Sequence, residues 1–332
     1  MITPDTEPTK GRRPRALITG AAGFAGSHLA DLLVGRGDVE VHGILRPNDG
    51  THHLGHLGDR IRLHCVDLRD DARVSEVLRA VEPDMVFHLA AQAAVGPSWE
   101  RPADTLVGNI LMQLHLLQAI VAHGQAPRIL VVGSADEYGL VTADDLPIDE
   151  DTPLRPLNPY AVSKIAQDML AYQYHLSHRL QIVRVRPFNH IGPRQGLGFV
   201  VPDFAQQIAR IEAGLQEPVV RVGDLSARRD FTDVRDMVRA YVLVLERGTP
   251  GAVYNIGSSR SRSIHEILDA LLRLSTCEVR VEVDAERLRP SDVREALCDC
   301  RRLRADTGWE PAIDLQQSLR DVLGYWRERV RA

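Results

Sequence analysis

Tyr160 and Lys164 are the two side chains whose types and spacing best suit proton transfer. They stand four residues apart in Tyr160-Ala-Val-Ser-Lys164, so a helix would place both on one face. A phenol has a pKa of about 10, and a neighbouring ammonium would lower it toward neutrality. Ser134 ends an expected strand, and its hydroxyl could bond the oxygen that Tyr160 protonates. The alternatives are a chance Tyr-x-x-x-Lys spacing and a serine that ties down a loop.

Three glycines indicate a site for a dinucleotide. Gly20, Gly23 and Gly26 lie in Ala16-Leu-Ile-Thr-Gly-Ala-Ala-Gly-Phe-Ala-Gly26, which runs from an expected strand into an expected helix. Such a turn is tight, lets the backbone approach a pyrophosphate and presents free helix amides to it. Phe24 and Ala25 are expected to contact the same cofactor.

The end of the second expected strand favours NADP(H) over NAD. An NAD enzyme would place Asp or Glu there to bind the ribose 2′-hydroxyl. This strand ends in Gly43-Ile-Leu-Arg46, and an arginine suits a 2′-phosphate. The alternative is a solvated arginine at a strand end.

Two further strand ends fit the same cofactor. Asp67 and Leu68 follow the third strand, where a carboxylate could meet the adenine amino group. Leu89, Ala90 and Ala91 follow the fourth strand, where small residues would let the backbone approach a ribose. His88, which precedes them, is expected to be a hydrogen-bonded core histidine.

The pattern of elements predicts an α/β fold: a Rossmann-type doubly wound parallel sheet with a smaller C-terminal α/β substrate-binding lobe. We expect a disordered tail over residues 1–14, an NADP-binding domain over 15–187 and 230–256, and a sugar-nucleotide-binding lobe over 188–229 and 257–330. The expected strands are Ala16–Thr19, Glu40–Leu45, Ile61–Val66, Met85–Leu89, Ile129–Gly133, Gln181–Arg186 and Val253–Ile256, with Phe188–Gly198 as a loop. The expected helices include Gly26–Arg36, Ala72–Val81, Leu106–His123, Pro159–Leu176, Val201–Ala213 and Leu315–Val330.

Taken together, these motifs resemble the extended short-chain dehydrogenase/reductases of the NAD-dependent epimerase/dehydratase superfamily. Within it, the sequence is most similar to the branch of GDP-mannose 4,6-dehydratases and GDP-6-deoxy-D-mannose reductases. The segments that resemble the reductases are Arg186-Pro-Phe-Asn-His-Ile-Gly-Pro193, Gly198–Ile208, Arg229-Asp-Phe-Thr-Asp-Val-Arg-Asp236 and Leu288-Arg-Pro-Ser-Asp292.

The resemblance implies a set of binding residues and a reaction. Asn189 would contact the sugar-linked phosphate, and Arg229 and Arg289 would bind the pyrophosphate, a role for which forked arginine donors are suited. Arg194, Arg221 and Arg228 are alternatives for this role, and any of these arginines could instead be an ordinary surface residue. It further implies Pro187 as a cofactor contact and Asp136 and Val200 as substrate contacts. The implied reaction is NADPH-dependent reduction of the 4-keto group of GDP-4-keto-6-deoxy-D-mannose to GDP-D-rhamnose.

The residues after Ser134 separate this reaction from its rivals. A 4,6-dehydratase needs extra acid–base groups there, but Ala135 carries none and only Asp136 could serve as a base. Reduction is therefore favoured, with a dehydratase or a nucleotide-sugar 4-epimerase as alternatives. A non-catalytic NADP-binding regulator is disfavoured because both Tyr160 and Lys164 are present.

The composition limits the kinds of partner that we expect the protein to bind. The net charge of −5 gives no sign of a nucleic-acid partner, so a phosphorylated substrate would need local cationic groups. No long apolar run or secretory signal is evident, so we expect no membrane and a cytoplasmic location. The cysteines, Cys65, Cys277, Cys298 and Cys300, are interpreted as reduced thiols, and no metal site is expected. The resemblance also implies a homodimer formed through a four-helix bundle.

Overall fold

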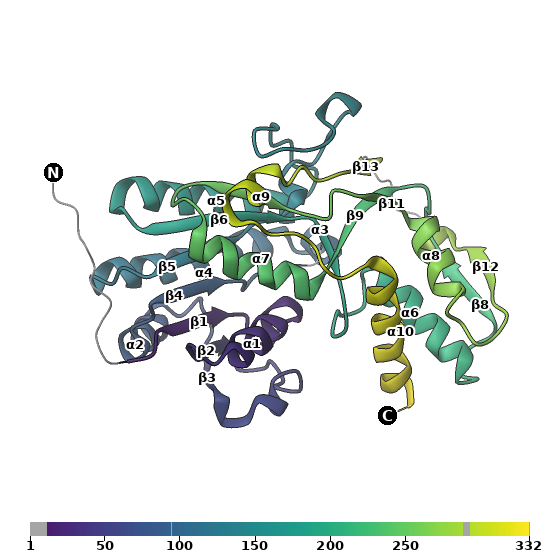
Figure 1. Ribbon diagram of the computed structural model, residues 1–332, viewed down its shortest axis with the longest axis horizontal. Helices are drawn as coiled ribbons and strands as arrows, with labels where there is room; N and C mark the ends of the chain where they lie inside the picture. The colour runs from purple at the N-terminus through teal and green to yellow at the C-terminus, as the bar shows by residue number, and fades with distance from the viewer. Residues whose placement is uncertain (1–11, 94, 288–292, 332) are drawn as a thin grey trace.

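A seven-stranded parallel sheet forms the centre of the protein (Figure 1). The structure is a computed structural model that describes residues 12–93, 95–287 and 293–331. The strand order is β10-β6-β5-β4-β1-β2-β3: β2 and β3 are added on one side of β1, and β4, β5, β6 and β10 on the other. The expected doubly wound fold is therefore confirmed. The strands are β1 (Arg15–Thr19), β2 (Glu40–Leu45), β3 (Ile61–Cys65), β4 (Met85–His88), β5 (Arg128–Val132), β6 (Gln181–Pro187) and β10 (Val253–Ile256).

Helices cover both faces of this sheet. α1 (Phe24–Arg36) and α7 (Val234–Arg247) pack in one core, and α2 (Asp71–Val81), α4 (Pro102–Ala122) and α5 (Pro159–His178) pack in the other. The start of α5 is well defined by its sequence, because the side chain of Asn158 accepts the N–H of Ala161 and Pro159 occupies the first turn. That cap places Tyr160 and Lys164 at the carboxyl end of the sheet.

A second, smaller core lies beside the sheet (Figure 1). It is built by α6 (Val200–Glu212), α8 (Ile264–Leu272) and α10 (Leu315–Arg331), with β8 (Val219–Val222) paired to β12 (Arg280–Val283). Ile208, Ile267 and Leu319 are fully buried within it. Each of these helices carries an apolar stripe that only its neighbours can bury, which explains why they cluster.

A small sheet around β9 joins the two parts. β9 (Arg228–Asp233) pairs with β7 (Asn189–Ile191), β11 (Ser261–Ser263) and β13 (Glu295–Ala296). The expected loop at Phe188–Gly198 therefore contains a strand. β7 is short and pairs with a strand about forty residues further on, so it leaves no local pattern in the sequence.

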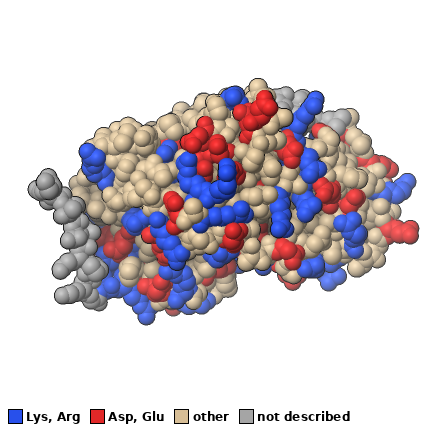
Figure 2. Space-filling view, turned by 45° about the horizontal axis from the view of Figure 1, so that its top comes forward, with Lys and Arg blue, Asp and Glu red and all other residues tan. Residues whose placement is uncertain are grey.

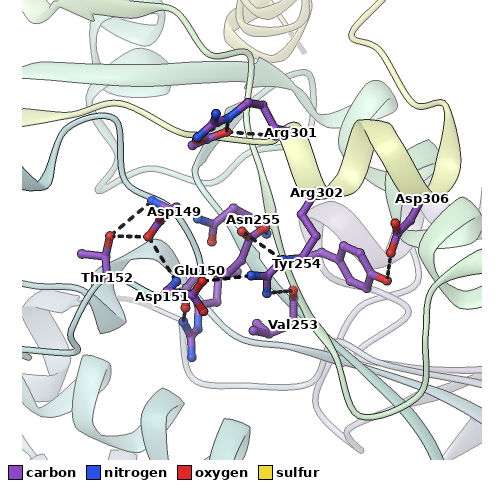
Figure 3. A network of polar contacts seen from close by, with 12 residues as sticks. Asp149, Glu150, Asp151, Thr152, Val253, Tyr254, Asn255, Arg301, Arg302 and Asp306 are labelled. Atoms are coloured by element: carbon purple, nitrogen blue, oxygen red, sulfur yellow. Dashed lines mark hydrogen bonds and ion pairs between the residues drawn. The ribbon is translucent and has the colours of Figure 1, made fainter.

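Part of the expected substrate lobe returns to the main core. α9 (Arg301–Thr307) and the residues around it lie within the range 257–330, yet Leu303 and Trp309 are buried in the core that contains α1 and α7. Figure 3 shows the polar side of this contact, where Arg302 pairs with Glu150 and Glu150 accepts the backbone N–H of Asn255 at 2.9 Å. The other lobe boundaries stay a prediction.

The structure also differs from two further sequence expectations, one about the N-terminal tail and one about apolar segments. Of the expected tail, residues 12–14 are held in place: Arg12 pairs with Asp84 at 2.8 Å, and the Pro14 carbonyl accepts the Glu40 N–H. α4 is long and apolar enough to cross a membrane, contrary to the expectation that no such run exists. It packs against α2 and α5, and the share of its most apolar window buried inside the protein is 39%.

Candidate active site

The glycine turn before α1 has the geometry of an anion site. Gly20 has φ +70°, and a Cβ there would lie 3.0 Å from the Cα of Ala90. A Cβ on Gly26 would overlap the Gly20 carbonyl. Gly23, the N-cap of α1, offers no side chain to the first helix amides. A pyrophosphate fits here, because the amides need acceptors and the helix N-terminus carries partial positive charge.

The ends of β2 and β3 place two arginines, Arg46 and Arg69, near Asp67. Arg46 is exposed and contacts Asp49 at 2.9 Å, and no carboxylate occupies the tip of β2. Asp67 accepts the backbone N–H and the guanidinium of Arg69, which lowers the pKa of Asp67, and Arg46 also acts on it electrostatically. Sequence reasoning missed Arg69. Its place two residues after Asp67, at a neighbouring strand end, is the signal that could have identified it.

The segment after β4 is held close to this turn. The N–H of Ala90 donates to the Thr19 hydroxyl at 3.1 Å, and the same hydroxyl lies 2.9 Å from His88 Nδ1. His88 is buried and hydrogen-bonded to Thr19, so the expected core histidine is confirmed, and desolvation lowers its pKa to about 3. Leu89 and Ala91 lie half-buried beside Ala90, while Leu68 is buried.

Tyr160, Lys164 and Ser134 come together at the ends of β5 and α5. The Tyr160 hydroxyl lies beside the Ser134 side chain, whose hydrogen bond opposes the larger rise in the Tyr160 pKa that burial causes. Lys164 is 3% exposed, and its Nζ donates to the Val132 carbonyl at 2.7 Å and to Gln167 Oε1 at 3.0 Å. The three sequence-predicted catalytic residues thus share one location.

The electrostatics of Tyr160 differ from the sequence expectation. Burial raises its pKa well above the ordinary value, and the charge of Asp136 raises it further. Lys164 was expected to lower this pKa, but its ammonium is directed at the end of β5. Burial also lowers the pKa of Lys164, to about 8. The structure therefore keeps Tyr160 as a protonated phenol, which is the form that can donate a proton.

Asp136 and Arg229 face each other across the site. Asp136 is accessible to solvent yet surrounded by protein, which raises its pKa, while Arg229 lowers it. Burial lowers the pKa of Arg229, and Asp136 and Asp224 oppose this shift. A cation in such a place suits a phosphorylated ligand better than an exposed arginine would.

The remaining predicted contacts are spread over neighbouring elements. Asn189 is exposed in β7, Val200 begins α6, and Pro187 is buried at the end of β6. His190, next to Asn189, stacks on Phe24 of the glycine turn with ring centroids 5.6 Å apart. Arg289 lies outside the described residues. In the described part of the chain, no group of His, Cys, Asp and Glu has metal-ligand geometry.

A Rossmann-type sheet, a glycine turn at its switch point and a Ser–Tyr–Lys set at the strand ends define an enzyme of the extended short-chain dehydrogenase/reductase class. More specifically, the chain belongs to the GDP-mannose 4,6-dehydratase family, whose model matches residues 17–322.

Known members of this class are similar to the chain over almost its whole length. GDP-6-deoxy-D-mannose reductase of Pseudomonas aeruginosa is 37% identical, over 96% of this chain and 98% of the relative. GDP-mannose 4,6 dehydratase 2 of Arabidopsis thaliana is 31% identical, over 92% of this chain and 84% of the relative. The solved structure of RMD from Pseudomonas aeruginosa complexed with NADPH superposes with a TM-score of 0.84 at 36% identity, covering 95% of this chain and 99% of that one.

Proposed function

We propose that the protein reduces the 4-keto group of a GDP-4-keto-6-deoxy-hexose with NADPH, converting GDP-4-keto-6-deoxy-D-mannose to GDP-D-rhamnose. The observation that carries the proposal is the composition of the site. Beside Ser134, Tyr160 and Lys164, it holds one further accessible carboxylate, Asp136, and Ala135 has no acid–base group. Ketone reduction requires a hydride and one proton, and these residues are sufficient for the proton.

The residues present fit NADPH. The Gly20–Gly26 turn would hold its pyrophosphate, and Arg46 and Arg69 would hold the 2′-phosphate at the ends of β2 and β3. Supporting this choice, the similar Pseudomonas aeruginosa RMD structure is a complex with NADPH. When bound, the cofactor supplies the hydride.

The chain's own residues would handle the substrate oxygen. Ser134 donates a hydrogen bond to the carbonyl, and Tyr160 gives its proton to the oxygen as negative charge develops there. Lys164 holds the end of β5 through Val132 and keeps a positive charge near the site. These interactions strengthen as charge builds, so they act chiefly on the transition state. Asn189 and Arg229 bind the diphosphate.

A GDP-mannose 4,6-dehydratase is the second candidate, and Asp136 is the observation that favours it. Its pKa is raised by the surrounding protein, which moves it toward the range of an effective general base. The family also contains dehydratases 31% identical to this chain.

One assay separates the two functions. Purified protein is given GDP-4-keto-6-deoxy-D-mannose with NADPH and, separately, GDP-mannose without added reductant. Stoichiometric oxidation of NADPH with the first substrate and inertness toward the second are expected. Formation of the keto-sugar from GDP-mannose would assign the protein to the dehydratases instead. Matched UDP and dTDP keto-sugars test the base, and only the GDP form should be used well.

We also propose a homodimer built on α4 and α5, in a cytoplasmic enzyme. Val162, Met169, Tyr172 and Leu176 form an exposed apolar stripe on α5, and Val107 is exposed on α4. A stripe of this kind on two adjacent helices suits burial against its own copy in a four-helix bundle.

A further inference from the structure

Glu137 is a buried carboxylate directly behind the catalytic serine. It is fully buried, and its Oε1 accepts the backbone N–H of Ser134 at 2.8 Å. Gly133 makes room for it, because a Cβ at that position would overlap Glu137 Oε1. The carboxylate therefore fixes the backbone of the residue that is to orient the substrate carbonyl.

The other oxygen of Glu137 belongs to a buried ionic cluster. Glu137 Oε2 accepts Arg186 Nε at 3.0 Å, and the same guanidinium pairs with Asp168 at 2.5 Å. Asp168 also pairs with Arg184 at 2.6 Å. Asp168 stands one turn after Lys164 on α5, so the cluster ties the Ser134 loop to the catalytic helix through β6. Both oxygens of Glu137 accept hydrogen bonds, which favours the ionised form, whereas burial and the charge of Asp168 raise the pKa of Glu137 above its ordinary value.

Lys164 is the amine that this carboxylate affects. The chain contains two lysines, Lys10 and Lys164, and arginine supplies the rest of its strongly basic side chains. Lys164 is consequently the one lysine among the described residues. Burial lowers its pKa to about 8, and the charge of Glu137 opposes that shift. An arginine would keep its charge without such help, whereas a buried lysine does not.

Other groups around Lys164 do not replace Glu137. His88 from β4 is neutral, since burial lowers its pKa to about 3. Tyr160 on the same helix is held as a protonated phenol by burial. Asp168, also on this helix, is engaged by Arg184 and Arg186.

We propose that Glu137 is a positioning residue of the active site: from behind the site it fixes the Ser134 backbone, and it acts electrostatically on Lys164, to whose helix it is tied through Arg186 and Asp168. The role rests on the proposed reductase function only for its kinetic consequence. The electrostatic part concerns this chain's own residues, so it is measurable whatever the substrate is.

The direct test is a titration of Lys164 by NMR. Lys10→Arg leaves a single lysine, and labelling with ¹³C-lysine then gives one side-chain Cε signal whose shift follows the charge of Lys164. In this background, Glu137→Gln keeps an acceptor for Ser134 but removes the charge. The titration midpoint of Lys164 should fall by about one pH unit, a roughly tenfold loss in proton affinity. An unchanged midpoint would overturn the proposal.

Glu150→Gln is the matched control. Glu150 is also a buried carboxylate that accepts one backbone N–H, from Asn255, and pairs with an arginine, Arg302 (Figure 3). It has no resolved influence on Lys164, so its neutralisation should leave the Lys164 midpoint in place. An equal fall in both variants would assign the effect to general loosening of the structure and overturn the specific role of Glu137.

Glu137→Asp keeps the charge but shortens the reach to Ser134, and it serves if Glu137→Gln does not fold. Its Lys164 midpoint should stay near that of the parent, while kcat for the keto-sugar falls with little change in KM. In Glu137→Gln, the loss of kcat/KM at high pH should begin at lower pH than in the parent.

If the parent shows no reductase activity but the midpoint shifts, the proposed function fails and the electrostatic role of Glu137 stands. If the parent is an active reductase but the midpoint does not shift, the proposed function stands and the role of Glu137 fails.

Discussion

At the scale of single residues, the surroundings of Tyr160 serve two purposes: one set of groups keeps the phenol protonated, and another binds the substrate oxygen. Burial and Asp136 keep the phenol protonated, and the Ser134 hydroxyl beside it provides a partner for the same substrate oxygen. Such a phenol is a proton donor that acts only when a stronger base appears nearby. In the proposed reduction, the alkoxide that develops during hydride transfer would be that base, so Tyr160 would release its proton only at that stage.

Tyr160→Phe removes the hydroxyl that we propose as the proton donor and keeps the ring. We expect kcat for the keto-sugar to fall by about 10²–10⁴-fold, the usual reach of acid–base catalysis. Binding of NADPH, followed by fluorescence titration, should change little, because the contacts to its pyrophosphate and 2′-phosphate lie elsewhere. A variant that retains near-parental kcat would show that another group protonates the product.

Arg46 carries the prediction about cofactor choice. Its guanidinium is exposed and bonded only to Asp49 in the described part of the chain, so it can turn to a phosphate at little cost. One charge-assisted hydrogen bond contributes roughly 1.5–3 kcal/mol, so Arg46→Ala should weaken NADPH about tenfold or more and leave NADH unchanged. Isothermal titration with both cofactors measures this. Arg73→Ala, an exposed α2 arginine paired with Glu76, is the control and should alter neither constant.

At the scale of elements, the β1–α1 turn shows how strictly packing dictates sequence. Gly26 is helical, yet a Cβ on it would overlap the Gly20 carbonyl, so α1 could not approach β1 as closely. Gly26→Ala should lower the free energy of unfolding by about 1–3 kcal/mol, the range for overpacked sites, and weaken NADPH binding as well. Denaturant unfolding and cofactor titration report the two effects.

Gly35→Ala is its control on the same helix. A Cβ there meets nothing within 4 Å, so alanine should leave cofactor binding intact and stabilise the protein by up to about 1 kcal/mol through helix propensity. If both variants lose stability equally, the close approach at Gly26 has no special role.

The elements that carried local signals could be predicted from the sequence. The glycine turn, strands β1 to β6 and the capped start of α5 have periodicities or end signals that act over a few residues. β7, β11 and β13 do not, because each is two or three residues long and pairs with β9 from a distance in the chain. The packing of Trp309 in the main core could not be predicted either, because it depends on tertiary contacts and not on the local sequence.

The site divides in the same way. Tyr160, Lys164 and Ser134 could be named because their chemistry is visible in type and spacing. The pKa of Tyr160 could not, since its direction depends on burial and on where the Lys164 ammonium points. Glu137 stands three residues after Ser134 in the sequence, but its role could not be predicted from that spacing. The role depends on the ion pairs of the Arg186 guanidinium with Glu137 and with Asp168, and Arg186 and Asp168 both come from other elements.

At the scale of the whole molecule, charge is distributed locally. Basic and acidic side chains are interspersed over the face shown in Figure 2, which agrees with a net charge of −5. A diphosphate ligand would thus be attracted by the arginines of the site and not by a uniformly positive surface. The more unusual feature of the surface is the exposed apolar stripe on α5, next to α4.

This stripe carries the prediction about assembly. Light scattering should give about twice the monomer mass of 36.9 kDa at micromolar concentration. Met169→Glu places a charge in the centre of the stripe, where the partner's own glutamate would face it in a two-fold interface, so it should shift the protein to monomers without unfolding it. Leu215→Glu, at an exposed leucine after α6 and away from the stripe, should leave the mass unchanged. Because Lys164 and Tyr160 lie on the same helix as Met169, the monomer should also show a lower kcat, as α5 would lose its packing against the partner. A parental mass for Met169→Glu would place any dimer contact elsewhere, and a parental protein of monomeric mass would exclude the dimer.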